Sequence, residues 1–405
     1  MSDIFLPECE IVDLTEELRK EIEEFGVSNI EEFFKKRLEN WKSVEVNIAI
    51  TGEAGSGKSS FINTIRELDD DDDDAAPVDV LECTKEPRSY DHPTNNKIKF
   101  WDLPGIGTPD YPDLDTYCNK VQLEKYHTYL IFTSTRFQAN DLKLAEKVRS
   151  IKKKFFFIRT KIDENARAQE KRKRKQKYDE EAMLARIREK CFQSLGNLLT
   201  NDQDIFLISN HDPDKWDFVR LTQAILDALT RYQRESMTFA LGKVITRSSQ
   251  DIFQRKVNVL RQRIWKVAAA SGVVAAIPVP GLSFAVDAAL ILRELSLYRS
   301  QLGLPEIGSA EFVQLHLATK KKVLSVTLTT AAQLSPYFAS YAASTAIEEF
   351  TRFVPFIGPA IASGMSFTTT YYALSKILPD VEEAAKLVLK EAAQKTAADL
   401  ENEVD

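Results

Sequence analysis

The sequence of 405 residues predicts an α/β domain with a mostly parallel sheet, inserted between two segments of an all-helical domain. Three observations support this prediction. Residues 44–50 alternate apolar and polar side chains and end at a glycine-rich turn, which is typical of a strand. Further strand-like runs follow, most of them separated by helical stretches, and this order favours a parallel sheet covered on both faces. After about residue 235 the strand pattern stops, and apolar residues recur at helical spacing.

The three segments are expected at residues 1–43, 44–235 and 236–405. Capping-box spacings and apolar residues at helical intervals predict a helix over 13–41. The middle segment has predicted strands at 44–50, 98–101, 129–133, 155–159 and 205–208, and helices at 140–151 and 180–198. The last segment has predicted helices at 236–265, 267–277, 282–301, 309–334, 336–351, 359–377 and 381–402.

Two apolar stretches, 267–292 and 353–375, approach the length needed to cross a bilayer. The first contains a single charge, Asp287, and the second contains none. Proline and glycine interrupt both stretches, and such breaks would leave backbone groups without hydrogen bonds in lipid. The pattern therefore favours buried helical hairpins over a transmembrane span, with a core hairpin that also meets a membrane as the alternative.

Composition narrows the class of protein. The net charge of −7 argues against nucleic acid as the main partner. The four cysteines are scattered without a CxxC pair, which suits a reducing compartment and offers no metal framework. The N-terminus lacks signal-peptide features, and Ser2 in place of glycine predicts no N-myristoyl anchor. We expect a cytoplasmic protein.

An acidic run at 69–74 and a basic run at 171–177 are interpreted as solvated segments, with contact to anionic lipid or a partner as the alternative for the basic run.

Residues 52–59 read Gly-Glu-Ala-Gly-Ser-Gly-Lys-Ser and match GxxxxGK[ST], between a predicted strand and a predicted helix. Glycines let the backbone N–H groups point at phosphates, and the helix N-terminus adds its positive dipole. Lys58 would reach the β- and γ-phosphates, and the Ser59 hydroxyl would bind Mg²⁺. The residues predicted to hold phosphate are Gly52, Gly55, Ser56, Gly57, Lys58, Ser59 and Ser60.

Asp102-Leu-Pro-Gly105 follows the predicted strand 98–101. An aspartate at this strand end can hold Mg²⁺ through water, while the backbone N–H of Gly105 contacts the γ-phosphate. The tetrapeptide is common by itself, but its place after a P-loop makes it specific. Asp102 is therefore a predicted metal and nucleotide residue.

Thr160-Lys161-Ile162-Asp163 closes the predicted strand 155–159. The Asp163 carboxylate suits the N1–H and N2–H₂ donors of guanine, whereas adenine presents a lone acceptor at N1. The Lys161 stem would pack on the base. Ser209-Asn210 follows the last strand and could donate a backbone N–H to the guanine carbonyl, although an ordinary loop fits these two residues equally well.

These motifs all follow predicted strands, at the edge where open α/β sheets bind ligands. Their order predicts a P-loop protein with a Ras-like G domain that binds GTP and GDP with Mg²⁺. The predicted metal residues are Ser59, Thr84 and Asp102.

The catalytic centre lacks one expected group. Many small GTPases place a glutamine directly after DxxG to orient the attacking water, and here that residue is Ile106. Hydrolysis by the isolated chain should therefore be slow unless another group positions water. The candidate catalytic residues are Lys58, Thr84, which would close on Mg²⁺ and the γ-phosphate, and Glu82, which would act on water or on a neighbour's nucleotide. An ordinary surface role stays open for Thr84 and Glu82.

The sequence resembles the immunity-related GTPases, an interferon-inducible family, and in particular the branch of that family with lysine in the P-loop. The resemblance lies in three stretches: Gly-Glu-Ala-Gly-Ser-Gly-Lys-Ser-Ser-Phe-Ile-Asn, Phe-Trp-Asp-Leu-Pro-Gly-Ile-Gly-Thr-Pro and Ile-Pro-Val-Pro-Gly. The resemblance implies hydrolysis of GTP to GDP and phosphate, with GTP-dependent self-assembly of G domains as dimers or oligomers. It also implies peripheral action at pathogen-vacuole membranes in innate defence. Two alternatives stay open: a weakly or non-hydrolysing switch or scaffold that regulates partners, and a dynamin-like membrane-remodelling GTPase.

Overall fold

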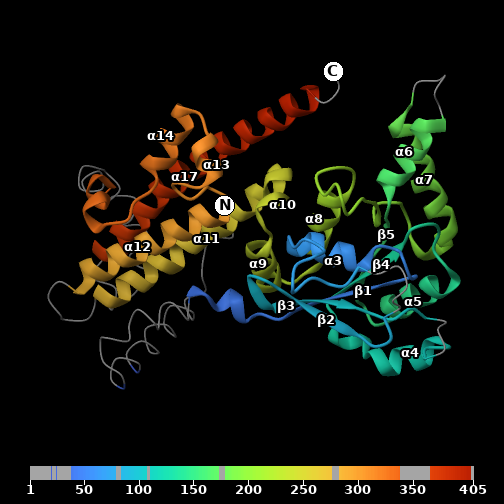
Figure 1. Ribbon diagram of the computed structural model, residues 1–405. Coiled ribbons are helices and arrows are strands. Elements are labelled where there is room, and N and C mark those ends of the chain that lie inside the picture. Colours follow the sequence, from blue (N-terminus) through green and yellow to red (C-terminus); the bar gives the residue numbers. More distant parts are fainter. Residues whose placement is uncertain are drawn as a thin grey trace. The chain divides into compact units, whose positions relative to one another are not determined.

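The computed structural model describes residues 20, 24, 38–78, 84–106, 110–172, 178–275, 282–337 and 365–402. The chain divides into two compact units. One unit is Trp41–Ile252, and the other combines residues up to Asn40 with residues from Phe253 onward. The first unit contains the sheet and the second is helical (Figure 1).

The sheet has six strands in the order β2-β3-β1-β4-β5-β6. Their bounds are β1 Val46–Gly52, β2 Arg88–His92, β3 Asn95–Asp102, β4 Thr128–Thr133, β5 Lys154–Arg159 and β6 Ile205–Leu207. Neighbouring strands pair in parallel, except β2 and β3, which pair antiparallel. The predicted mostly parallel α/β sheet is confirmed.

Helices pack on both faces of this sheet because successive side chains of each strand point to opposite sides. The helices of the unit are α3 Lys58–Arg66, α4 Leu114–Val121, α5 Ala139–Ser150, α6 Ile162–Arg172, α7 Glu180–Leu195, α8 Phe218–Ala228, α9 Arg231–Ala240 and α10 Lys243–Ser248. Ile48 and Ile50 of β1 belong to a buried cluster with residues of α3, α8 and α9. Ala49, between them, belongs to a second cluster with residues of α4 and α5.

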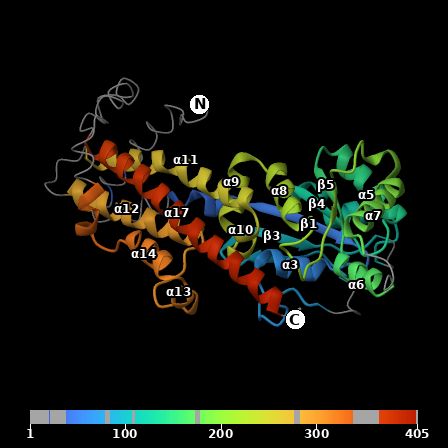
Figure 2. The ribbon, with the colours of Figure 1, turned by 90° about the horizontal axis from the view of Figure 1, so that it is seen from above.

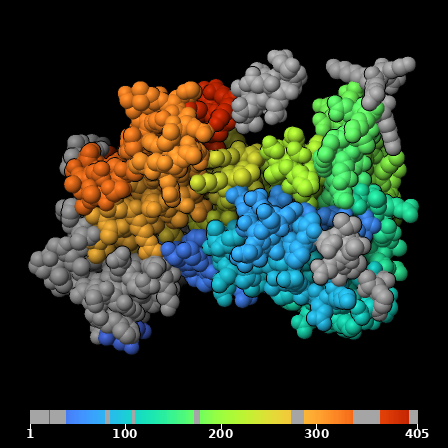
Figure 3. Space-filling view, viewed as in Figure 1, coloured from blue at the N-terminus to red at the C-terminus, as the bar shows by residue number. Residues whose placement is uncertain are grey.

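Five of the six strands were predicted, each within three residues of its observed ends. Strand β2 was not predicted, because only Tyr90 and His92 of its five residues are buried and its other side chains are polar. The acidic run 69–74 is an exposed loop after α3, as expected for a solvated segment (Figure 3). Most of the basic run 171–177 lies outside the described residues.

The helical unit contains α11 Gln250–Ala275, which begins in the last residues of the first unit, α12 Leu282–Gln301, α13 Ala310–Gln314, α14 Leu317–Ser325 and α17 Met365–Asn402. Figures 1 and 2 show α12 beside α17, and these two helices share many contacts.

Several predicted helix boundaries in this half of the chain are wrong. The predicted break at residue 266 does not exist, and the chain instead breaks on both sides of α10. The predicted helix 309–334 is divided into α13, α14 and a 3₁₀ turn at Ala331–Leu334. The expected break between 377 and 381 is absent, since α17 continues through Pro379. The predictions for 13–41, 336–351 and both proline-containing turns fall largely outside the described residues.

Buried polar groups link the helices of this unit. Arg263 of α11 and Glu294 of α12 form an ion pair of 2.8 Å, with side chains 3% and 1% exposed, and Arg263 also donates to the carbonyl of Leu38. The Asp287 carboxylate accepts a hydrogen bond from Ser271, and burial raises its pKa. The single charge of the apolar stretch 267–292 thus lies inside the helical core. Of the helices that the structure describes, none combines the length and the apolar character needed to cross a membrane.

Candidate nucleotide-binding site

The P-loop connects β1 to α3 in a shape that requires glycine. Gly52 has a φ of 138°, and a Cβ there would lie 2.1 Å from the Phe132 carbonyl oxygen. Gly57 is the N-cap of α3, with a φ of 84°, and as glycine it supplies no side-chain cap. The N-terminus of a helix presents backbone N–H groups and a positive dipole, and this is an arrangement that binds phosphate.

Lys58 and Glu53 hold this loop in place. The Lys58 ammonium donates to the carbonyls of Gly52 and Glu53 at 3.2 and 3.1 Å, so the charge lies over the loop. The Glu53 carboxylate accepts hydrogen bonds from the Thr133 hydroxyl at 3.0 Å and from the Ser134 N–H at 3.2 Å. The P-loop is thus fastened to the carboxyl end of β4.

Asp102 lies at the end of β3 and is 4% exposed. The Thr84 hydroxyl donates to its Oδ2 at 2.7 Å. Its Oδ1 is buried and has no hydrogen-bond partner among the described residues. Burial raises the pKa of Asp102, while the Lys58 charge and the Thr84 hydrogen bond act to lower it.

A buried carboxylate oxygen without a partner is normally unfavourable and indicates a missing ligand. Hard cations such as Mg²⁺ prefer oxygen donors. Asp102 and Thr84 supply such oxygens, and Ser59 follows Lys58 in the first turn of α3. The chemistry of the predicted metal residues therefore fits Mg²⁺.

The loops after β5 and β6 pack against the P-loop. The Thr160 hydroxyl donates to the Ser56 carbonyl at 2.7 Å, and the Asn210 amide donates to the Gly57 carbonyl at 2.8 Å. Thr160 and Ser209 are fully buried. The structure thus brings the predicted base-binding residues to the same edge of the sheet as the predicted phosphate-binding residues.

Asp163 lies in the first turn of α6, with a side chain 7% exposed. Burial acts to raise its pKa, but hydrogen bonds from Ser209 and Arg167 outweigh it and lower the pKa below the usual value. Asp163 is therefore an ionised acceptor at neutral pH. Lys161 lies two residues before Asp163, with a positive φ of 58° and a side chain that is 43% exposed.

Sequence reasoning missed three groups near this edge. Arg167 binds the predicted base-recognition carboxylate. Asn140, at the start of α5, donates to the Ile106 carbonyl at 3.2 Å. The next residue, Asp141, has its pKa raised to about 6, chiefly by burial. Only the i, i+4 spacing of Arg167 from Asp163 was visible in the sequence. Of the predicted residues, Glu82 lies outside the described part of the chain.

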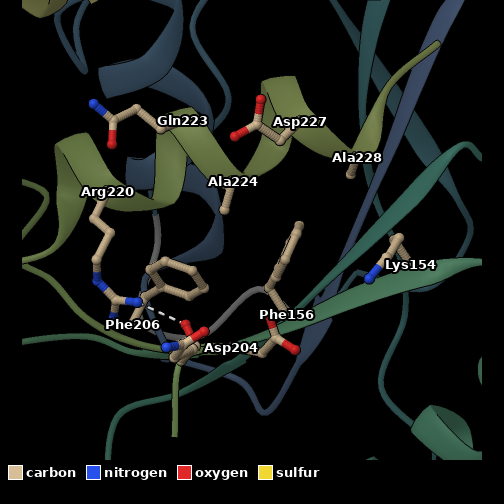
Figure 4. Close-up of a pocket in the computed structure, with 10 residues that line it drawn as sticks. Lys154, Phe156, Asp204, Phe206, Arg220, Gln223, Ala224, Asp227 and Ala228 are labelled. Atoms are coloured by element: carbon tan, nitrogen blue, oxygen red, sulfur yellow. Dashed lines mark hydrogen bonds between the residues drawn. The ribbon is translucent and has the colours of Figure 1, made fainter. Parts of the chain in front are cut away.

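A cavity of about 480 Å³ lies elsewhere, at the amino ends of β5 and β6 (Figure 4). Phe156 and Phe206 form its floor, and the Arg220 guanidinium lies 4.0 Å from the Phe206 ring centroid. The predicted nucleotide residues follow the carboxyl ends of the strands, and none of them lines this cavity. It is therefore not the nucleotide site.

The strand order, the P-loop between β1 and α3 and the loops that follow β3, β5 and β6 define a P-loop GTPase fold. A family model described as interferon-inducible GTPase (IIGP) matches residues 11–392. The chain therefore belongs to the interferon-inducible GTPase family and is a GTPase. The resemblance seen in the motifs is confirmed.

Curated relatives agree with this assignment. Bovine interferon-inducible GTPase 5 is 32% identical over 381 residues, which cover 92% of this chain and 81% of the relative. Mouse interferon-gamma-inducible GTPase 10 is 30% identical over 369 residues, covering 91% and 87%. Mouse interferon-inducible GTPase 1 is 34% identical over 271 residues, covering 66% and 64%. Among solved structures, Era from Aquifex aeolicus matches at 17% identity over 55% of this chain and 68% of that one, with a TM-score of 0.30.

Proposed function

We propose that this GTPase binds GTP and GDP with Mg²⁺ at the P-loop edge of the sheet and hydrolyses GTP efficiently only when two G domains pair. The G domain was expected at 44–235 and the helical domain at 1–43 with 236–405; since α9 and α10 belong to the sheet-containing unit, we place the end of the G domain near Ile252. The observation that carries the proposal is the environment of Ile106, which stands where a water-orienting glutamine is common.

Ile106 packs against an apolar cluster and has no group that can hold water. Its carbonyl is occupied by Asn140. Orientation of the attacking water must therefore come from another group, and a second molecule can supply one. We propose that Glu82 orients the attacking water and that Thr84 closes on the γ-phosphate.

The other roles follow from the contacts. Lys58 turns from its loop carbonyls to the β- and γ-phosphates, joined there by the N–H groups of residues 55–60. Asp102, Ser59 and Thr84 would hold Mg²⁺, which when bound would neutralise phosphate charge. The backbone N–H of Gly105 would face the γ-phosphate. Asp163 accepts the N1–H and N2–H₂ groups of guanine, supported by Ser209 and flanked by Lys161.

Family membership supports the wider part of the proposal. The names of the relatives describe interferon-inducible GTPases. We infer a cytoplasmic protein of innate defence that assembles through its G domains and contacts the membranes of pathogen vacuoles peripherally.

The test is the GTPase rate per molecule measured against protein concentration, with Lys58→Ala as the inactive control. We expect the rate to rise with concentration and to reach a plateau. A rate independent of concentration would contradict assembly-dependent hydrolysis. No phosphate release at any concentration, under single-turnover conditions, would favour the switch or scaffold alternative. Co-sedimentation with vesicles in the presence of GTP tests the dynamin-like alternative. If the protein binds no vesicle, that alternative is excluded.

A further inference from the structure

Arg167 occupies the carboxylate that should read the base. It lies one helical turn after Asp163 on α6, and its guanidinium Nη2 donates to Asp163 Oδ2. The Asp163 side chain is 7% exposed, whereas the Arg167 side chain is 66% exposed. The carboxylate is thus buried, whereas most of the Arg167 side chain faces solvent.

The chemistry of the two donors is alike. A guanidinium presents parallel N–H groups that match a carboxylate. The N1–H and N2–H₂ groups of guanine form a similar planar pair, and they require both oxygens of Asp163. Arg167 already donates to Oδ2, one of the two oxygens that guanine needs, so the base must displace the guanidinium or share this oxygen with it.

We propose that Arg167 is an intramolecular competitor of guanine for Asp163, and that it sets how fast the nucleotide enters. The inference rests on the proposed role of Asp163 in reading the base. In the closed state Arg167 covers the carboxylate, and in the open state the base can bind. Arg167 is a gate on nucleotide entry rather than a catalytic residue.

A competitor of this kind has a kinetic signature. Only the open fraction accepts the base, so the apparent association rate constant is reduced by that fraction. Once guanine is bound, Arg167 is already displaced, so the dissociation rate constant does not depend on it. The competition concerns the base, so GMP, GDP and GTP should be affected to the same extent.

The experiment is stopped-flow binding of fluorescent guanine nucleotides to the full chain. Arg167→Ala is compared with the wild type, and Arg167→Lys is a conservative variant that keeps the charge without the planar fork. The matched control is Arg186→Ala, which removes an equal charge. Arg186 of α7 donates to Gln169 of α6 at 3.1 Å, and it lies away from the Asp163 carboxylate in the hydrogen-bond network of the described residues. Measurement at pH 8 keeps Asp163 ionised in every variant.

Exposed ion pairs at this spacing change an equilibrium by about twofold, and charge-assisted hydrogen bonds to a buried carboxylate by more. We therefore expect about three- to tenfold faster association for Arg167→Ala, with dissociation within about twofold of the wild type. Arg167→Lys should be intermediate, and Arg186→Ala unchanged. Unchanged or slower association in Arg167→Ala would overturn the inference, and so would faster dissociation, because that would make Arg167 a ligand of the nucleotide.

Asp163→Asn separates this inference from the proposed function. If it leaves guanine affinity unchanged, Asp163 does not read the base and both proposals fail at this site. If it weakens guanine binding while Arg167→Ala leaves association unchanged, the base site stands and only the gate is wrong. Circular dichroism melting of each variant confirms that the fold is intact.

Discussion

Glu67→Ala should destabilise the sheet-containing unit by about 2 kcal/mol. Glu67 ends the P-loop helix α3, and its carboxylate accepts hydrogen bonds from the N–H groups of Lys243, Val244 and Ile245 at 3.0, 2.7 and 3.2 Å. These are the first residues of α10, so Glu67 caps a helix about 176 positions away in sequence. A helix N-cap is worth about 0.5–2 kcal/mol, and a negative charge at a helix N-terminus adds about 0.3–1 kcal/mol.

Two further variants separate the contributions. Glu67→Gln keeps an acceptor but loses the charge, so it should be destabilised by about 1 kcal/mol. Glu67→Gly removes the same hydrogen bonds as alanine, but glycine relieves the left-handed φ of 52° and should recover about 1 kcal/mol. The assay is urea unfolding followed by tryptophan fluorescence. Alanine within about 0.5 kcal/mol of the wild type, or glycine less stable than alanine, would refute the reasoning.

Three other predictions follow from the site. Gly52→Ala should abolish nucleotide binding and lower the melting temperature, since its Cβ would lie 2.1 Å from a carbonyl oxygen. A Cβ at Gly55 would meet nothing within 4 Å, so Gly55→Ala should lower the free energy of unfolding by only about 1 kcal/mol. Equal melting temperatures of the two variants would contradict this prediction. Asp141→Asn should raise the melting temperature at pH 8 and change it little at pH 4. Burial raises the Asp141 pKa from 3.8 to about 6, so the folded protein loses stability as pH rises through that window, and a larger gain at pH 4 would reverse the sign. Lys58→Ala should weaken GTP binding by at least about a hundredfold, measured by calorimetry, because it removes the charge proposed to face the phosphates. Urea unfolding should show a loss of only about 1 kcal/mol, from the two hydrogen bonds to loop carbonyls. Affinity close to that of the wild type would exclude the role proposed for Lys58.

Local patterns were sufficient for most of the sheet. Alternation over β1 and the buried runs of β4 and β5 predicted those strands because their side chains fill the core on one or both faces. Strand β2 was not predicted because only two of its residues, Tyr90 and His92, are buried, and the polar residues around them obscure the apolar pattern of a strand.

Helix boundaries in the second half depend on distant residues. The break before α10 at Gly242 is stabilised by the Glu67 carboxylate, a contact that no window of local sequence contains. The predicted break at 378–380 contains Pro379, yet Leu378 and Val381 are almost fully buried, and their packing offsets the backbone hydrogen bond that proline cannot make.

The motif residues of the site could be located from the sequence because their backbone geometry is local. Thr84 was selected only by residue type and position, and its hydroxyl does lie 2.7 Å from Asp102, although its role in hydrolysis stays a proposal. The contacts of Glu53, Asn140 and Arg167 could not be predicted, since each joins a side chain to a loop or carboxylate whose placement requires the folded structure.

Calorimetric titration of GDP and ADP into the wild-type chain with Mg²⁺ tests the central claim most directly. A carboxylate that reads the amide-like edge of guanine should favour GDP by a factor on the order of 10⁴. Equal affinity for ADP, or no binding of either nucleotide, would contradict the site described above.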